Sequence, residues 1–94
     1  MFKLTGTFAT QNGPKYLQQL CKHFAHKIDV THSDTEGTCS FPMGQAVLKA
    51  DDAGLTIRFE LKDQDAVDPA RNVIDSHLER FAFRENFKHM TWSA

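Results

Sequence analysis

The chain has 94 residues, 40% of them hydrophobic and 24% charged, with a formal net charge of −1. This length suits one domain with a modest core, and the composition excludes an intrinsically disordered chain. Such a balanced charge lacks the positive field that concentrates proteins on nucleic-acid phosphates or anionic lipids, so we expect neither nucleic acid nor a membrane among its partners.

The sequence also bears on the cellular compartment. No apolar run approaches the roughly 18–20 residues that span a bilayer, and the opening segment lacks the pattern of a signal peptide, so we expect a cytoplasmic protein. The two cysteines, Cys21 and Cys39, have no CxxC spacing. In a reducing compartment such thiols usually fill the core, with a disulfide between them as the alternative.

The first predicted elements are a strand and an amphipathic helix. Phe2, Leu4 and Phe8 alternate with polar residues, as in a strand with one buried face. Pro14 then opens a helix that we expect to reach about Lys27. Its apolar stripe comprises Leu17, Leu20, Cys21, Phe24 and Ile28. Its opposite side is basic and carries Lys15, Lys22, His23, His26 and Lys27.

Several alternating segments follow this helix. Turn-forming residues at 33–37 and 51–54 separate them, as expected for hairpin connections. The alternating segments themselves lie at residues 28–32, 39–43, 45–50 and 55–61. The last has the clearest alternation, and we therefore place these segments in the same sheet as the first strand.

A second helix is predicted next. Two starts compete: Asp63-Gln64-Asp65, or Asp68 as N-cap with Pro69 as the first helical residue. We expect the helix to end near Phe83, with that ring tucked back, and residues 87–92 to form a short final strand. The apolar stripe of this helix comprises Val67, Ala70, Ile74, Leu78 and Phe81.

Together these elements predict one α+β domain over residues 1–94, in the order β-α-β-β-β-α with a short final strand. An antiparallel sheet with both helices packed on one face buries each apolar surface and leaves the other face open. The residues expected on the open face are Lys3, Thr5, Thr7, Asp29, Thr31, Ser40, Lys49, Arg58 and Glu60, with Val47 as the main apolar member. This face lacks the stacked aromatic rings of an RNA-binding sheet.

One thiol and two imidazoles lie close together on the first helix. At about 100° per residue, Cys21 falls within the apolar stripe while His26 points away from it, so these two cannot share a site. His23 and His26 could offer two metal ligands, but Lys22 and Lys27 oppose a cation. We therefore predict no metal and no cofactor. A metal-binding protein or a small enzyme using these histidines is the alternative.

The second helix adds further candidate binding residues. His77 lies at the border of the apolar stripe, and Arg80 and Arg84 on the same side suit carboxylate or phosphate recognition. The candidate ligand-binding residues are His23, His26, His77, Arg80 and Arg84. Their charge favours an anionic small molecule or an acidic protein surface.

No catalytic residues are predicted. The sequence has no G-x-S-x-G, no phosphate-cradling glycine loop, and no Cys or Ser with a base at a local spacing. The acidic pairs Asp51-Asp52 and Asp63/Asp65 lie in turns, where aspartate serves local hydrogen bonding.

Three segments resemble one known family. Lys15–Lys27, Lys49–Leu55 and His77–Glu85, with Trp92 near the end, are similar to the bacterial family called domain of unknown function 2218. The resemblance implies an α+β layer similar to TATA-binding-protein-like or phosphohexomutase C-terminal domains. It also implies an accessory role in iron or siderophore handling, and no catalytic residues.

The leading hypothesis is a non-enzymatic binding or interaction domain. The alternatives are the metal-binding protein or enzyme described above, and a homodimer that assembles through the open sheet face or a sheet edge.

Overall fold

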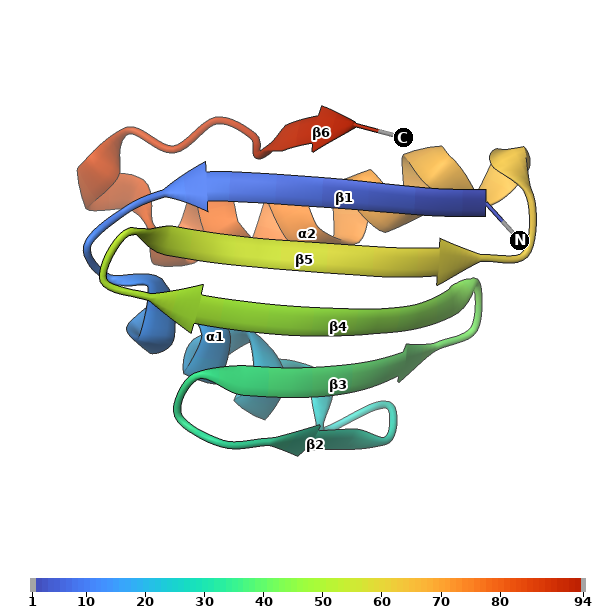
Figure 1. Cartoon of the computed structure of the whole chain (residues 1–94), viewed down its shortest axis with the longest axis horizontal. Coiled ribbons are helices and arrows are strands. Elements are labelled where there is room, and N and C mark those ends of the chain that lie inside the picture. Colours follow the sequence, from blue (N-terminus) through green and yellow to red (C-terminus); the bar gives the residue numbers. More distant parts are fainter. Residues whose placement is uncertain (1, 94) are drawn as a thin grey trace.

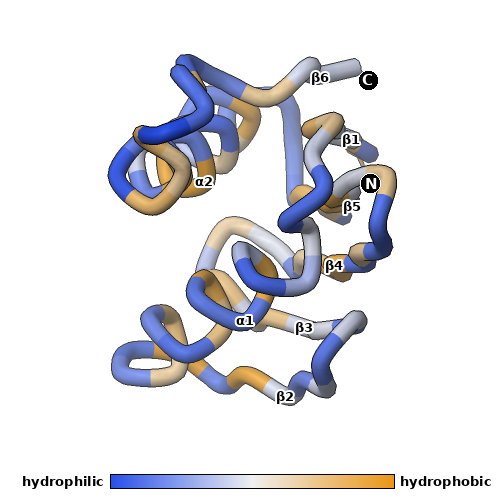
Figure 2. Tube along the Cα trace, turned by 90° about the vertical axis from the view of Figure 1, so that its left-hand side faces the viewer, coloured by the Kyte–Doolittle hydropathy of each residue, from blue (hydrophilic) through white to orange (hydrophobic). Residues whose placement is uncertain are grey.

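The computed structural model describes residues 2–93 and has two layers, a sheet and a pair of helices (Figure 1). The sheet has six antiparallel strands in the order β2-β3-β4-β5-β1-β6. Both helices lie on one of its faces, as Figure 2 shows from the side. The predicted α+β class and the helices on a single face are confirmed. Among these residues, no helix is both long and apolar enough to cross a membrane.

The bounds of β4 and β5 follow the predicted alternation closely, whereas β3 begins and ends earlier than the expected 39–43, and the final strand is shorter and later than the expected 87–92. The strands are β1 Phe2–Ala9, β2 Val30–His32, β3 Glu36–Phe41, β4 Gly44–Asp51, β5 Gly54–Leu61 and β6 Thr91–Ser93. The helices are α1 Gly13–Phe24 and α2 Val67–Phe81, with short 3₁₀ turns η1 Gln64–Ala66 and η2 Phe83–Glu85. The segment after α1 forms the three-residue edge strand β2, which pairs with β3. Counting this short strand, four strands lie between α1 and α2.

The first helix ends at Phe24, earlier than the expected Lys27. Beyond it, the N–H of His26 donates to the His23 carbonyl at 3.3 Å, and that of Lys27 donates to the Phe24 carbonyl at 2.9 Å. These bonds span three residues and tighten the last turn, because the chain must leave the helix to enter the edge strand β2. His26 and Lys27 therefore lie on a turn.

The second helix uses the earlier of the two predicted starts. The turn η1 follows Asp63 and runs directly into α2, so Asp68 and Pro69 lie inside the first helical turn. The expectation that Phe83 tucks back is wrong, because its side chain is 64% exposed. It lies in η2, where the Arg84 guanidinium sits 5.6 Å from the centre of its ring.

The core lies between the helices and the sheet. Leu17 and Leu20 of α1 and Ile74 and Leu78 of α2 are fully buried, together with side chains of β1, β4 and β5. Cys21 and Cys39 are also buried there, and both are free thiols. The hydrogen bond with Cys21, together with burial, raises the pKa of the Cys39 thiol. Cys39 therefore stays protonated and acts as a core residue.

The final strand β6 is held by contacts that the sequence pattern did not indicate. A Cβ on Gly6 would lie 2.6 Å from the Trp92 ring, so this ring can pack on β1 only where glycine stands. The carboxylate of Asp75 on α2 accepts hydrogen bonds from the Met90 N–H and the Trp92 indole N–H, both at 2.9 Å. These contacts tie the end of the chain to the second helix.

Candidate functional site

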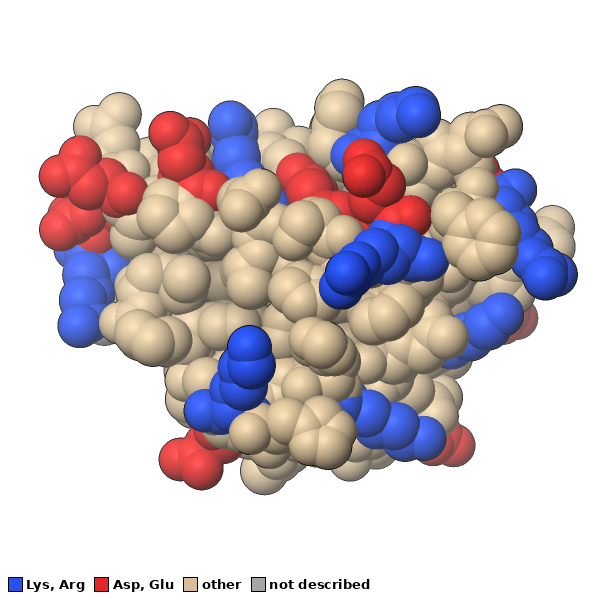
Figure 3. All heavy atoms as spheres, turned by 180° about the vertical axis from the view of Figure 1, so that it is seen from behind, with Lys and Arg blue, Asp and Glu red and all other residues tan. Residues whose placement is uncertain are grey.

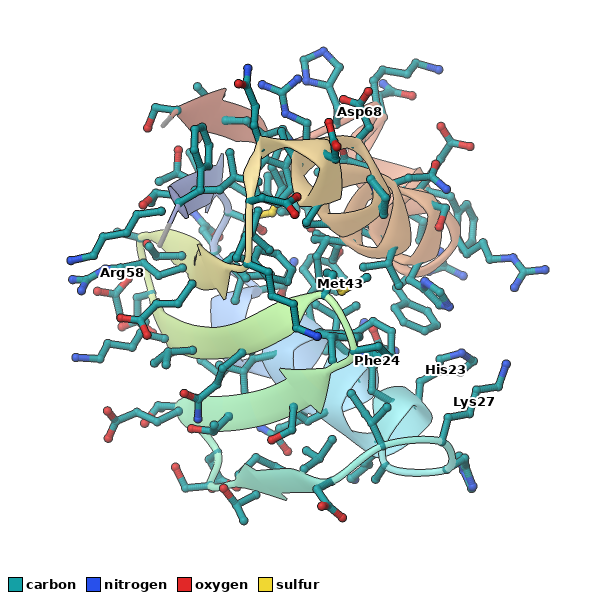
Figure 4. All side chains as sticks on the ribbon, turned by 90° about the vertical axis from the view of Figure 1, so that its right-hand side faces the viewer. His23, Phe24, Lys27, Met43, Arg58 and Asp68 are labelled. Atoms are coloured by element: carbon teal, nitrogen blue, oxygen red, sulfur yellow. The ribbon has the colours of Figure 1, made fainter. Side chains whose placement is uncertain are left out.

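A pair of histidines joins the two helices. His23 Nε2 lies 3.0 Å from His77 Nε2, although the two residues are 54 positions apart in the chain. Their ring centres are 4.5 Å apart and the rings are tilted by 54°. Both side chains are half-buried. In Figure 4, His23 lies on the helix side of the molecule, opposite Arg58 on the other side of the sheet.

The hydrogen-bond roles within the pair follow from a backbone contact. His77 Nδ1 lies 2.6 Å from the Val73 carbonyl oxygen. Because a carbonyl can only accept, Nδ1 carries the proton, and Nε2 of the neutral ring is an acceptor. His23 Nε2 must then donate to it. The last turn of α1 and the C-terminal half of α2 are thereby joined by one N–H···N bond, from His23 to His77.

Aromatic rings surround the pair. Phe24 lies 5.1 Å from the His77 ring and 5.8 Å from the His23 ring, and Phe81 lies 6.2 Å from His23, all measured between ring centres. Behind them, Phe41 of β3 packs edge-on against Phe24 at 5.0 Å. These rings exclude water from one side of the imidazoles and strengthen any electrostatic interaction there.

Two permanent cations, Lys27 and Arg80, lie near His23. Burial lowers the pKa of His23, and the electrostatic effects of His77, Lys27, His26 and Arg80 lower it further. Within residues 2–93, the groups that act on this ring include no carboxylate. The imidazole pair therefore lies in a local positive field without an acidic counterpart.

The line of contact between α1 and α2, which we call the seam, has a carboxylate at its other end. The Glu85 carboxylate of η2 accepts hydrogen bonds from Thr10 at 2.7 Å, from the Asn12 amide at 3.1 Å and from the Tyr16 hydroxyl. The hydrogen bond from Tyr16 is the largest cause that lowers the pKa of Glu85. Burial and this same contact raise the pKa of Tyr16 to about 12. Both oxygens of Glu85 thus accept hydrogen bonds within this Glu85 cluster of Thr10, Asn12, Tyr16 and Glu85.

These two contacts show that the helices run antiparallel, since Tyr16 meets Glu85 and His23 meets His77. Between them on α1 lies Gln19, one turn before His23. Its side-chain oxygen is buried and has no hydrogen-bond partner within residues 2–93. The seam between the helices is therefore polar at both ends and holds an unpaired acceptor in its middle.

The structure brings together some of the predicted site residues. His23 and His77 are in contact, and Arg80 and His26 are close enough to affect the His23 ring. Arg84 lies in η2 over the Phe83 ring and is not among the charged groups acting on His23. The face in Figure 3 shows Lys and Arg side chains spaced apart, with uncharged surface and some Asp and Glu side chains between them. The cationic site is thus local and does not extend over the whole face.

Metal ligands are limited to the two imidazoles at this point. Over the described part of the chain, no group of three or more His, Cys, Asp or Glu side chains could hold an ion. The nearby Lys27 and Arg80 are cations. The residues present therefore fit an anion better than a metal ion.

The open sheet face contains the second candidate surface. Thr5, Arg58, Val47 and Thr38 are register partners in one row across β1, β5, β4 and β3. A hollow of about 540 Å³ near the turn between β4 and β5 and a hollow of about 240 Å³ around Arg58 share Lys49 as a lining residue. Val47 is 40% exposed at this face. Its mixture of hydroxyls and both signs of charge favours no single ligand class.

Some of these residues were outside the sequence prediction. Glu85, Tyr16 and Gln19 were not singled out, because helical spacing describes each helix alone and does not show which residues of α1 face α2. The signal that could have found Glu85 was its place in the HLERFAFRE segment. Asp51 was interpreted as a turn residue, and its carboxylate does accept the N–H groups of Ala53 at 2.8 Å and Gly54 at 3.0 Å.

Comparisons with known proteins agree with this fold. Residues 5–93 match a family described as an uncharacterized protein conserved in bacteria, DUF2218. The chain is also similar to the NMR structure of PA4090 from Pseudomonas aeruginosa, with 28% identity and a TM-score of 0.80 over 99% of this chain and 96% of that chain. A search of curated proteins found no match.

Proposed function

The chain belongs to DUF2218, a family of uncharacterised proteins conserved in bacteria, and from this premise we propose that it is a binding domain for an anion. The ligand lies at the His23–His77 end of the seam between α1 and α2. Because the family description names no activity, the proposal depends on the chemistry of this chain's own residues.

One observation carries the proposal. Two permanent cations act on the His23 ring, and they come from two elements: Arg80 from α2 and Lys27 from the turn after α1. Gathering like charges costs free energy, and a bound anion would offset that cost. The guanidinium of Arg80 adds the planar donors that suit a carboxylate or a phosphate.

The nature of the ligand is constrained by the rings around the pair. Phe24 and Phe81 lie beside the imidazoles, so a compact anion can be partly removed from water at this point, where its attraction to the cations is stronger. An acidic side chain of a partner protein offers the same chemistry. An anionic iron chelate also belongs to this class, which keeps the association with iron or siderophores as part of the proposal.

The cytoplasmic location is part of the same proposal. The two free, buried thiols of Cys21 and Cys39 support it, since thiols persist in a reducing compartment.

Thermal unfolding at low ionic strength tests the binding function. We would add sulfate, phosphate, citrate and ferric citrate, and expect at least one to raise the melting temperature, because a ligand that binds only the folded state stabilises it. Sulfate and phosphate also stabilise proteins in general by exclusion from their surface, so the comparison must be between variants. Arg80→Ala and Lys27→Ala should reduce the shift.

Arg84→Ala is the matched control, since Arg84 is an exposed arginine of the neighbouring turn that does not act on His23. Its shift should equal that of the unchanged protein. Equal shifts in all variants would mean general salt stabilisation and would refute the proposed site.

Assembly is the second candidate function, and the exposure of Val47 at the centre of the open sheet face supports it. A homodimer through this face would cover Val47, which is 40% exposed and flanked by Arg58 and Thr38. Sedimentation equilibrium tests this proposal: a dimer that Val47→Glu converts to a monomer supports it. A monomer at all concentrations rules it out.

A further inference from the structure

The His23–His77 contact has a property that the binding function alone does not require. Its two outer nitrogens are not equivalent. Nδ1 of His77 donates to the Val73 carbonyl at 2.6 Å, whereas Nδ1 of His23 is the position at which the neutral pair can accept another proton. The inner Nε2 atoms, 3.0 Å apart, already share one proton.

This arrangement limits the pair to one additional proton. Protonation of His23 at Nδ1 leaves the inner N–H···N bond intact and makes it a charge-assisted bond, which is stronger than a neutral one. A further proton would have to occupy Nε2 of His77, which would place two N–H groups against each other. The pair can therefore change its charge by one unit without losing the contact between the helices.

The surroundings oppose this proton while the site is empty. The groups that act on His23 are the cations Arg80 from α2 and Lys27 from the turn after α1, together with the imidazoles of His77 and His26. From the sheet, the uncharged ring of Phe41 in β3 packs against Phe24, which lies beside His23. Burial and these cations lower the pKa of His23. An anion bound here would reverse the sign of the local field and favour protonation.

We propose that the His23–His77 pair takes up one proton when the anion binds, so that this site binds an anion and a proton together. The inference rests on the proposed binding function and adds its regulation: binding tightens as the pH falls, and the proton goes to His23 Nδ1. The bond between His23 and His77 remains in both states. The opposite end of the seam, at Glu85, remains unchanged because both oxygens of this carboxylate already accept hydrogen bonds.

The linkage between proton uptake and anion binding sets how strongly the affinity depends on pH. The affinity for the anion should rise by at most about tenfold for each unit of pH decrease, which is the limit for one linked proton. The rise should stop below the pKa of His23 in the empty site, since the proton is then already present. The remaining affinity at high pH should come from the cations Arg80 and Lys27.

Calorimetric titration with sulfate tests the proposal, because sulfate keeps the same charge across the range used. The titrations would be run on the whole chain between pH 5.5 and 8 at constant ionic strength, each in two buffers with different enthalpies of ionisation. The difference between buffers counts the protons taken up. We expect a maximum near one proton per sulfate, and an affinity that falls from low to high pH.

Two variants separate this proposal from a general effect of charge. His23→Gln should lose the proton uptake and the pH dependence while keeping the weaker binding typical of high pH. His26→Gln removes an exposed histidine three residues from His23. This variant should keep most of the proton uptake and most of the pH dependence.

A failure of the proton linkage and a failure of the binding function would give different results. Sulfate binding that depends on Arg80 but has the same affinity at every pH would overturn the proton linkage and leave the binding function standing. The absence of any binding that depends on Arg80 would overturn the binding function and, with it, this inference. Proton uptake that persists in His23→Gln would also refute the assignment to this pair.

Discussion

The two ends of the α1–α2 seam join the same helices but differ in how charge is balanced. At one end, the Glu85 carboxylate accepts hydrogen bonds from the neutral donors Thr10, Asn12 and Tyr16, so both of its oxygens have partners. At the other end, the His23–His77 pair lies near the cations Lys27 and Arg80. A charge whose hydrogen bonds are all made stabilises the fold and leaves little for a ligand to improve. An unbalanced one weakens the fold slightly and offers binding energy to a partner.

The largest expected effect comes from the core that supports both ends. Leu78 is fully buried in α2, between His77 and Glu85 in sequence. Leu78→Ala should lower the free energy of unfolding by about 2–5 kcal/mol, because it removes buried apolar contacts and leaves a cavity. Urea denaturation measures the change. An unchanged urea midpoint would show that α2 does not pack as described.

The Glu85 end should be the more costly one to break. Glu85→Ala removes the acceptor of the partly buried Tyr16 and Thr10 hydroxyls. Because Glu85 itself is exposed, water can replace part of these bonds, so we expect a loss of about 0.5–1.5 kcal/mol. Arg84→Ala is the control in the same turn and should change stability by less than about 0.5 kcal/mol. If the two variants lose equal stability in urea denaturation, the Glu85 cluster is not the tie we describe.

The structure of the Glu85 end leads to a prediction that absorbance spectroscopy can test. Tyr16 is the single tyrosine of the chain, so the absorbance of its phenolate reports this one residue. Burial and the contact with Glu85 raise the pKa of Tyr16 to about 12. The unfolded chain ionises at lower pH, so the stabilisation is complete below about pH 10 and is lost as the pH rises toward the folded value.

Glu85→Gln is the matched test of the cause. It removes the negative charge but keeps an acceptor, so the pKa of Tyr16 should fall only part of the way toward its usual value, because burial, the larger cause, remains. A pKa unchanged from that of the parent protein would mean that burial alone sets it.

Changes at the His23–His77 end should have the smallest effect on stability. The stability contributed by His23 should depend on pH in the opposite direction from that contributed by Tyr16. The pKa of His23 is lowered in the folded state, so below about pH 6.5 the unfolded chain binds more protons than the folded one. The stability contributed by the neutral ring is thus complete above that pH and is lost on acidification.

Urea midpoints between pH 5 and 8 measure this effect. His23→Gln should flatten the acid side of the profile, whereas His26→Gln, at an exposed position, should leave it nearly as it was. A His23→Gln profile identical to that of the parent protein would contradict the assignment.

The same contrast explains what the sequence could predict. Alternation in residues 55–61 and the stripe that contains Ile74 and Leu78 reflect burial, which repeats along each element, and these predictions of strand and helix are confirmed. The ends of helices and strands are less predictable, since the early end of α1 depends on where β2 must begin. The exposure of Phe83 likewise depends on the turn η2, which has no sequence period.

The candidate site was predictable only in part, for a physical reason. His23 and His77 could be placed on their helices, but their contact depends on how α1 and α2 lie against each other. That relation is also set by Glu85, which receives hydrogen bonds from residues 69 to 75 positions earlier in the chain. Arg84 and Arg80 looked equivalent in sequence, and the fold separates them because α2 ends between them at Phe81.

Chemical-shift mapping of sulfate binding at pH 6.5 tests the central claim most directly. The account predicts that, at constant ionic strength, the ring signals of His23 and His77 and the amides of the turn at His26 and Lys27 change together with one affinity, and that Arg80→Ala removes the change. The signals of Arg84 and of Arg58 on the open face should remain in place. Changes centred on Arg58 and Lys49, with the histidine rings unaffected, would contradict it.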